Sequence, residues 1–152
     1  MKPLFPIFIR IEGRQILIVG AGPVAVRKAK GLLESGAHLR VVAPEGDPEM
    51  ETLAVTRERR NFAVSDLDGA ELVFAATNDR ELNQSIGEAC RQRGIWVNIA
   101  DAAEECDFHI PARIHSGEFQ IAISTGGKDP KAARELRKRI ERLLAEPCDH
   151  KV

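Results

Sequence analysis

Apolar and polar residues are grouped along the chain in blocks that predict strands and helices in alternation. Short apolar runs have the length and continuity of strands covered on both faces of a parallel sheet. These runs span residues 16–19, 39–43, 61–64, 72–76 and 95–99, and a looser alternation at 7–11 predicts an edge strand before them. Helical spacing recurs over 23–35 and 78–93, with a shorter helical stretch within 46–60. This order predicts an α/β fold with a Rossmann-like parallel sheet.

A different pattern begins after residue 105. Two stretches, 111–115 and 119–124, flank a Ser-Gly-Glu turn and predict a β-hairpin. A final helix is expected from residue 130 to about 145, and one side of it is apolar. The apolar positions are Ala133, Leu136, Ile140, Leu143 and Leu144. Because a hairpin and one helix bury little apolar surface alone, we expect this segment to pack against a second copy of the chain.

Composition narrows the possible partners and compartments. The 152 residues carry 22 Lys and Arg against 23 Asp and Glu, so nothing favours a general nucleic-acid or membrane binder. No apolar run approaches the roughly 20 residues of a membrane span, and the proline-interrupted start does not resemble a signal peptide. The cysteines, Cys90, Cys106 and Cys148, lack metal-ligand spacing. A reducing cytoplasm is the expected setting, and no metal site is expected.

The glycine motif after the first buried strand predicts a dinucleotide site. Gly20 and Gly22 precede a helical pattern, and Ala25 stands at the third position of the fingerprint. Gly20 permits a tight turn, Gly22 permits close approach of a pyrophosphate, and the start of the helix attracts phosphate. The alternative is a glycine turn in another kind of α/β protein. The residues assigned to the nucleotide here are Gly20, Ala21, Gly22, Pro23, Val24 and Ala25.

The end of the second strand departs from the fingerprint. An acid that binds the ribose is usual there, but the chain has Ala43 and Pro44, with Glu45 just beyond. Glu45 is either that acid or a solvated loop residue. No arginine follows the strand directly, which favours NAD over NADP. The cluster over 57–60 is interpreted as a solvated face, with contact to an anionic ligand as the alternative.

Polar residues also follow the fourth and fifth strands, where ligands of open parallel sheets bind. Thr77 and Asn78 are candidates to contact the cofactor, although Asn78 with Glu81 also has the spacing of a helix cap. Asp101 is a candidate proton-transfer group, and a cap with Glu104 is its alternative. Cys90 lies on an apolar helix face and is expected in the core. His109 and His115 are further acid–base candidates, with structural roles as the alternative.

The passage before the last helix combines hydroxyls, glycines and a lysine. Ser124, Thr125 and Lys128 surround a glycine pair, an arrangement that suits an anion-binding nest. Its spacing is not that of a Walker A loop. Asp129 is expected to cap the helix that Pro130 begins.

Taken in order, these motifs resemble the precorrin-2 dehydrogenase family, which includes the amino-terminal module of siroheme synthase. The resemblance runs from about residue 4 to residue 144. Its motifs are Gly-Ala-Gly-Pro-Val-Ala-Val-Arg-Lys at 20–28, Val-Val-Ala-Pro at 41–44, Ala-Ala-Thr-Asn-Asp at 75–79, Val-Asn-Ile-Ala-Asp at 97–101, Cys-Asp-Phe at 106–108, Pro-Ala at 111–112, Ile-Ala-Ile-Ser-Thr-Gly-Gly-Lys at 121–128 and Ala-Arg at 133–134.

The resemblance implies NAD-dependent oxidation of precorrin-2 to sirohydrochlorin by a homodimer. Asp101 matches the family's catalytic aspartate, and Ser124 matches a cleft serine that some members phosphorylate. The second strand of the family likewise ends in Val-Ala-Pro. The implied organisation is an NAD-binding domain over 1–110, a dimerisation and active-cleft segment over 111–146 and a disordered tail over 147–152. Cofactor residues then also include Ala43, Pro44, Thr77 and Asn78, and substrate residues are Asn98, His115, Ser124, Thr125, Gly126 and Lys128.

Two other functions are kept as alternatives. Some relatives also insert iron, and Asp101 with His109 or His115 would then receive the metal or protons. A nucleotide-sensing module of an ion channel is a different class, and Ala43 and the Ser-Thr-Gly-Gly-Lys passage argue against it. Many relatives carry a further helical region, so we expect the form ending at Val152 to leave the cleft open or to need a partner.

Overall fold

The computed structural model describes residues 4–145, which fall into two compact units. The first unit comprises residues 6–108, and the described part of the second comprises residues 4–5 and 109–145. No helix within 4–145 is long and apolar enough to cross a membrane. The tail expected over 147–152 lies outside the described residues.

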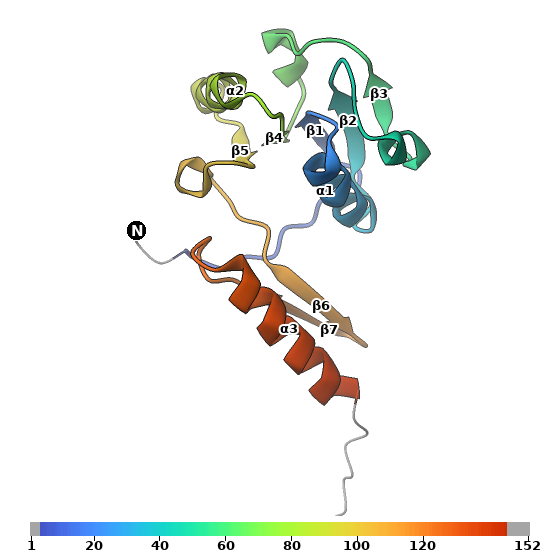
Figure 1. Cartoon of the computed structure of the whole chain (residues 1–152), viewed down its shortest axis with the longest axis vertical. Coiled ribbons are helices and arrows are strands. Elements are labelled where there is room, and N and C mark those ends of the chain that lie inside the picture. The colour runs from blue at the N-terminus through green and yellow to red at the C-terminus, as the bar shows by residue number, and fades with distance from the viewer. Residues whose placement is uncertain (1–3, 146–152) are drawn as a thin grey trace, which may run out of the picture. The chain divides into compact units, whose positions relative to one another are not determined.

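The first unit is built on a five-stranded sheet in the order β3-β2-β1-β4-β5, and every pairing is parallel (Figure 1). Its strands are β1 (Gln15–Val19), β2 (His38–Val42), β3 (Thr56–Glu58), β4 (Leu72–Ala75) and β5 (Trp96–Ile99). Its helices are α1 (Pro23–Leu33) and α2 (Arg80–Gln92), with 3₁₀ turns η1 (Pro48–Thr52), η2 (Val64–Leu67) and η3 (Ala103–Glu105). The predicted Rossmann-like fold is confirmed.

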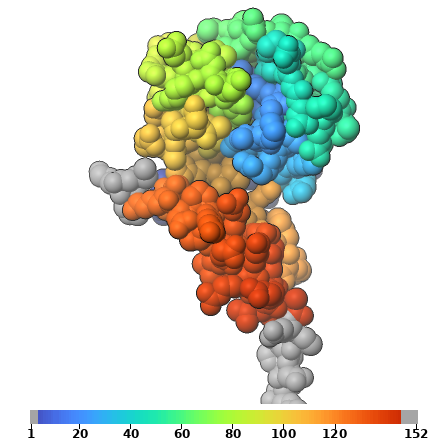
Figure 2. All heavy atoms as spheres, in the orientation of Figure 1, coloured from blue at the N-terminus to red at the C-terminus, as the bar shows by residue number. Residues whose placement is uncertain are grey.

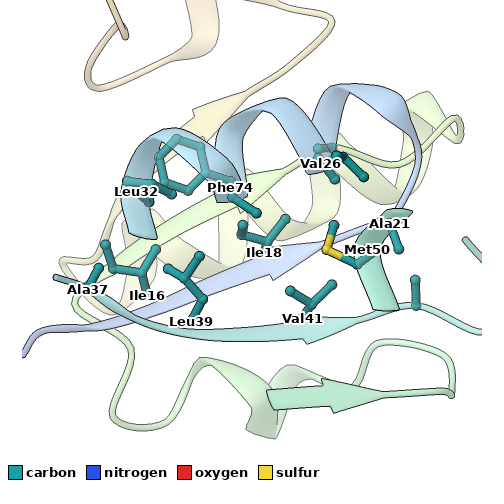
Figure 3. Packing of buried hydrophobic residues seen from close by; sticks show 14 of the residues in the cluster. Ile16, Ile18, Ala21, Val26, Leu32, Ala37, Leu39, Val41, Met50 and Phe74 are labelled. Atoms are coloured by element: carbon teal, nitrogen blue, oxygen red, sulfur yellow. The ribbon is translucent and has the colours of Figure 1, made fainter. Parts of the chain in front are cut away.

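Two hydrophobic clusters explain why the strands read as continuous apolar runs. Ile16, Ile18 and Phe74 belong to the cluster that includes α1 residues, which Figure 3 shows packed between helix and sheet. Leu17 and Val73, on the opposite face of the same strands, belong to the cluster with α2 residues. Because both faces of β1 and β4 are covered, alternation disappears from their sequences.

Two predicted strands are wrong. The third strand is Thr56–Glu58 rather than residues 61–64, which lead into η2. This strand is polar because it lies at the sheet edge, where Glu58 pairs with Arg40 and Arg60. Residues 7–11 form no strand and join neither sheet. The edges of the sheet are instead β3 and β5.

Three local interpretations are also corrected. The cluster over 57–60 is a solvated face only in part: the side chain of Arg59 is 67% exposed, but that of Arg57 is 9% exposed and Arg60 pairs with the buried Asp66. Asp79, not Asn78, caps α2: its carboxylate accepts a hydrogen bond from the backbone N–H of Leu82 at 3.1 Å. Asp101 caps no helix, since η3 begins after Ala102.

The second unit contains the predicted hairpin and helix. Strands β6 (Ala112–Ser116) and β7 (Phe119–Ile123) pair antiparallel, and α3 (Pro130–Ala145) packs against β6. Asp129 caps α3 as expected, because its carboxylate accepts from the N–H of Ala132 at 2.8 Å. Of the predicted apolar stripe only Ala133 is buried. Much of α3 forms the outer surface of this unit (Figure 2).

Candidate functional site

The two glycines of the loop after β1 have different structural requirements. Gly20 has φ of +106°, and a Cβ atom there would be driven into the carbonyl of Ala76, 2.6 Å from its carbon. Gly22 has an ordinary extended conformation, with φ of −76°, and a Cβ atom there meets nothing within 4 Å. The fold therefore requires glycine at position 20 but not at position 22, where a side chain would fill open space at the start of α1.

The first turn of α1 is suited to an anion. Gly22 is its N-cap and supplies no side-chain hydrogen bond, and the turn holds no acidic residue. The first backbone bond of the helix runs from the N–H of Val26 to the carbonyl of Gly22 at 3.0 Å. The N–H groups of Val24 and Ala25 lie before it, where a helix leaves donors for a ligand. Together with the open space at Gly22, these donors fit the pyrophosphate of a dinucleotide.

The loop after β2 folds back on the glycine loop. The N–H of Asp47 donates to the carbonyl of Ala21 at 2.8 Å, and a Cβ atom at Gly46 would lie 2.5 Å from that of Ala21. Arg57 holds this loop from β3 by donating to the carbonyls of Ala43, at 2.8 Å, and Glu45, at 3.2 Å. The cluster over 57–60 included Arg57 as a solvated residue or an anion contact, so its role in holding this loop was not predicted.

A buried amide joins the ends of β4 and β5. Asn83, on α2, accepts hydrogen bonds at its side-chain oxygen from the N–H of Thr77 at 3.1 Å and from its hydroxyl at 2.7 Å. The amide nitrogen donates to the carbonyl of Thr77 at 3.1 Å and to Oδ1 of Asp101 at 3.2 Å. Sequence reasoning missed Asn83. Its signal was a polar residue on the buried side of α2, beside Ile86.

Asp101 combines a fixed position with access to solvent. Its side chain is 39% exposed, and the guanidinium of Arg80 lies 3.8 Å from Oδ1. Arg80 also forms an ion pair with Glu105. A carboxylate held at one oxygen by a neutral amide can accept a proton at the edge of the sheet. The expected cofactor residue Asn78 is exposed in the same loop as Thr77.

Asn98 lies on β5 and is buried, with both ends of its amide bonded inside the first unit. Its oxygen accepts from Nζ of Lys28 at 2.6 Å, and its nitrogen donates to the carbonyl of Phe108 at 2.9 Å. The Lys28 ammonium lies 5.1 Å from the ring centroid of Phe74. Burial lowers the pKa of Lys28 to about 8. These contacts give Asn98 a structural role, and substrate binding by it stays a prediction.

The cysteines of the first unit behave as core groups. Cys90 is fully buried between α2 and the sheet, as predicted, and burial raises the pKa of its thiol to about 11. The Cys106 thiol accepts from the N–H of Ile99 at 3.1 Å, and burial raises its pKa as well. Among residues 4–145, no three His, Cys, Asp or Glu side chains are grouped to hold a metal ion.

The remaining predicted residues belong to the second unit. His115 is exposed on β6. Ser124 and Thr125 use their side-chain oxygens to accept from loop N–H groups, of Gly126 at 3.0 Å and of Asp129 at 2.9 Å. The hydroxyls therefore order the loop between β7 and α3, and Lys128 is exposed in it. Anion binding by this loop stays a prediction.

Comparison with known proteins places this site in a family. A family model described as "Putative NAD(P)-binding" matches residues 7–112, and one described as "Sirohaem biosynthesis protein central" matches residues 117–143. The chain belongs to this NAD(P)-binding family. The glycine loop, α1 and the ends of β2, β4 and β5 all lie within the first match.

Curated relatives and a solved structure extend the likeness over both units. The siroheme synthases of Thioalkalivibrio sulfidiphilus and Chromobacterium violaceum are each 42% identical over 144 residues, or 92% of this chain. The chain spans only 29% and 31% of their lengths. The structure of SirC, a precorrin-2 dehydrogenase, matches with a TM-score of 0.76 and 26% identity, covering 92% of this chain and 70% of that one.

Proposed function

We propose that this chain catalyses the NAD-dependent dehydrogenation of precorrin-2 to sirohydrochlorin in siroheme biosynthesis. The observation that carries the proposal is the likeness to SirC, which extends over both units at a TM-score of 0.76. The siroheme synthase relatives support the same pathway. The open space at Gly22 and the free first turn of α1 support binding of the cofactor's pyrophosphate.

In this reaction NAD, when bound, supplies the hydride acceptor. The chain binds the pyrophosphate at Gly22 and the N–H groups of Val24 and Ala25. The loop that Arg57 holds, which includes Ala43 and Pro44, forms the wall for the adenosine ribose through its backbone, because no carboxylate stands at the end of β2 itself. The absence of an arginine directly after β2 favours NAD over NADP.

Asp101 is the group that accepts the substrate proton, or that orients the ring through a pyrrole N–H. Its carboxylate is exposed enough to meet a substrate and is held by an amide donor. Loss of two hydrogens from precorrin-2 sends a hydride to NAD and a proton to a base. Thr77 and Asn78, at the end of β4, would contact the cofactor in this reaction.

The carboxylates of precorrin-2 require cations and hydrogen-bond donors. Lys128 and Arg134 are exposed near the beginning of α3, where the helix end adds positive potential. The predicted substrate residues of the second unit, His115, Ser124, Thr125 and Gly126, lie on β6 and in the loop before α3. Their charge and polarity suit a polyanionic tetrapyrrole.

We also propose a homodimer through the second unit. Along α3, Leu136, Leu143 and Leu144 are exposed, and Phe119 is exposed on β7. The exposed fraction of Leu143 is 66%. A second copy of the chain would cover this apolar surface. The cytoplasmic location stays a prediction. It is supported by the three cysteines, which lack metal-ligand spacing.

Anaerobic incubation of the chain with precorrin-2 and NAD tests the activity. Formation of NADH together with the sirohydrochlorin spectrum supports the proposal, and no NADH above the protein-free rate rejects it. Addition of ferrous ion to the product separates the second activity. Metal insertion faster than without protein would extend the function to that of a ferrochelatase.

A further inference from the structure

Asn83 is a buried polar residue of the first unit to which the sequence patterns assigned no role. Its side chain is 0% exposed on an otherwise apolar side of α2. A buried amide destabilises a fold unless its donors and acceptors are satisfied. Here both lone-pair positions face Thr77, one donor faces the Thr77 carbonyl and the other faces Asp101.

The bonds of Asn83 connect the loop after β4 to the loop after β5. Thr77 follows β4, and Asp101 follows β5, the neighbouring strand. The hydrogen bonds to Thr77 fix the rotation of the amide group. That rotation aims the remaining N–H at Oδ1 of Asp101, at 3.2 Å.

We propose that Asn83 is a positioning residue. It holds the carboxylate of Asp101 at a fixed place relative to Thr77, at the end of β4, where the cofactor is proposed to bind. The inference rests on the proposed dehydrogenase function. A hydride and a proton leave one substrate molecule, so the base and the hydride acceptor must keep a defined separation. Misplacement of a reacting group by about 1 Å can lower a rate by roughly 100-fold.

Kinetics of Asn83→Ala and Asn83→Asp test the positioning role, with Gln84→Ala as the matched control. Gln84 is an exposed amide on the next position of α2, bonded to Glu88. We expect kcat, counted per NAD-binding site, to fall by about tenfold or more in both Asn83 variants. The affinity for NAD should fall by a smaller factor than kcat. In Asn83→Asp, a carboxylate oxygen takes the place of the N–H that donates to Asp101. Wild-type kcat in either variant would overturn the proposal.

An NMR measurement tests the contact itself and does not depend on Asn83 variants folding. The side-chain amide protons of Asn83 are observed without NAD or substrate. We expect Asp101→Ala to move one of them upfield, because it loses a carboxylate acceptor, and Asp68→Ala, at an exposed acid, to leave both unchanged. An unmoved Asn83 signal in Asp101→Ala would contradict the inference. Absence of NADH with the wild-type chain would instead contradict the proposed function.

Discussion

Alanine at Gly20 and alanine at Gly22 should have opposite consequences, although the two glycines are separated by one residue. At Gly20 the new Cβ atom would overlap the Ala76 carbonyl, and φ of +106° is strained for any L residue. A residue in such a conformation costs about 1–3 kcal/mol before the overlap is counted. Since β1 and β4 are the centre of the sheet, this variant should lose several kcal/mol of unfolding free energy or fail to fold.

At Gly22 the same substitution meets no atom within 4 Å and an ordinary φ. Removing a glycine stabilises by about 0.4–1 kcal/mol through the unfolded chain, and alanine is a poorer N-cap than glycine by a similar amount. The two effects offset, so the unfolding free energy should change by less than about 1 kcal/mol. NAD affinity should fall at least about tenfold, because the methyl group occupies the space that the pyrophosphate needs.

Urea unfolding and calorimetric titration with NAD measure the two effects separately. Gly22→Asp adds a negative charge at the same place and should bind NAD more weakly still. Unchanged NAD affinity in Gly22→Ala, or a loss of stability as large as in Gly20→Ala, would refute the interpretation of this loop as a cofactor site.

Three further predictions concern a proton, a base and an interface. Asp101→Ala should bind NAD normally and lose most turnover, and wild-type rates would exclude a catalytic role. The pKa of Lys28 is lowered to about 8 from an ordinary 10.5. Between those pH values the unfolded chain binds more protons than the folded chain. The contribution of Lys28 to the free energy of unfolding therefore rises with pH, by up to about 3 kcal/mol. In urea titrations from pH 7.5 to 10.5, Lys28→Met should lack this rise; the difference from wild type removes the opposing effect of Cys90, whose pKa is raised. Leu143→Glu should be monomeric in sedimentation at micromolar concentration, and a monomeric wild type would reject the dimer.

The sequence predicts the centre of the fold better than its edge. Strands β1, β2, β4 and β5 are largely apolar runs because both faces of the sheet are covered. Their residue types therefore predict that they are buried. Strand β3 could not be found this way. Its Thr-Arg-Glu sequence is polar because the strand lies at the sheet edge, where Arg57 binds backbone carbonyls and Glu58 pairs with arginines.

The candidate site divides in the same manner. The glycine loop has a spacing that sequence shows directly, and Asp101 could be located because it follows a strand. Asn83 and Arg57 could not be assigned, since their roles depend on loop backbone brought close by the fold. The sequence also does not show that the two glycines have different roles. The fold requires glycine at position 20, whereas at position 22 the folded chain has room for a side chain, and only a bound ligand would require glycine there.

The most direct test of the central claim is NADH formation from precorrin-2 by the wild-type chain under anaerobic conditions. One NADH should form for each sirohydrochlorin produced, the rate should saturate with NAD, and Asp101→Ala should lose most of both products. Sirohydrochlorin formation at the protein-free rate, with no NADH, would contradict it.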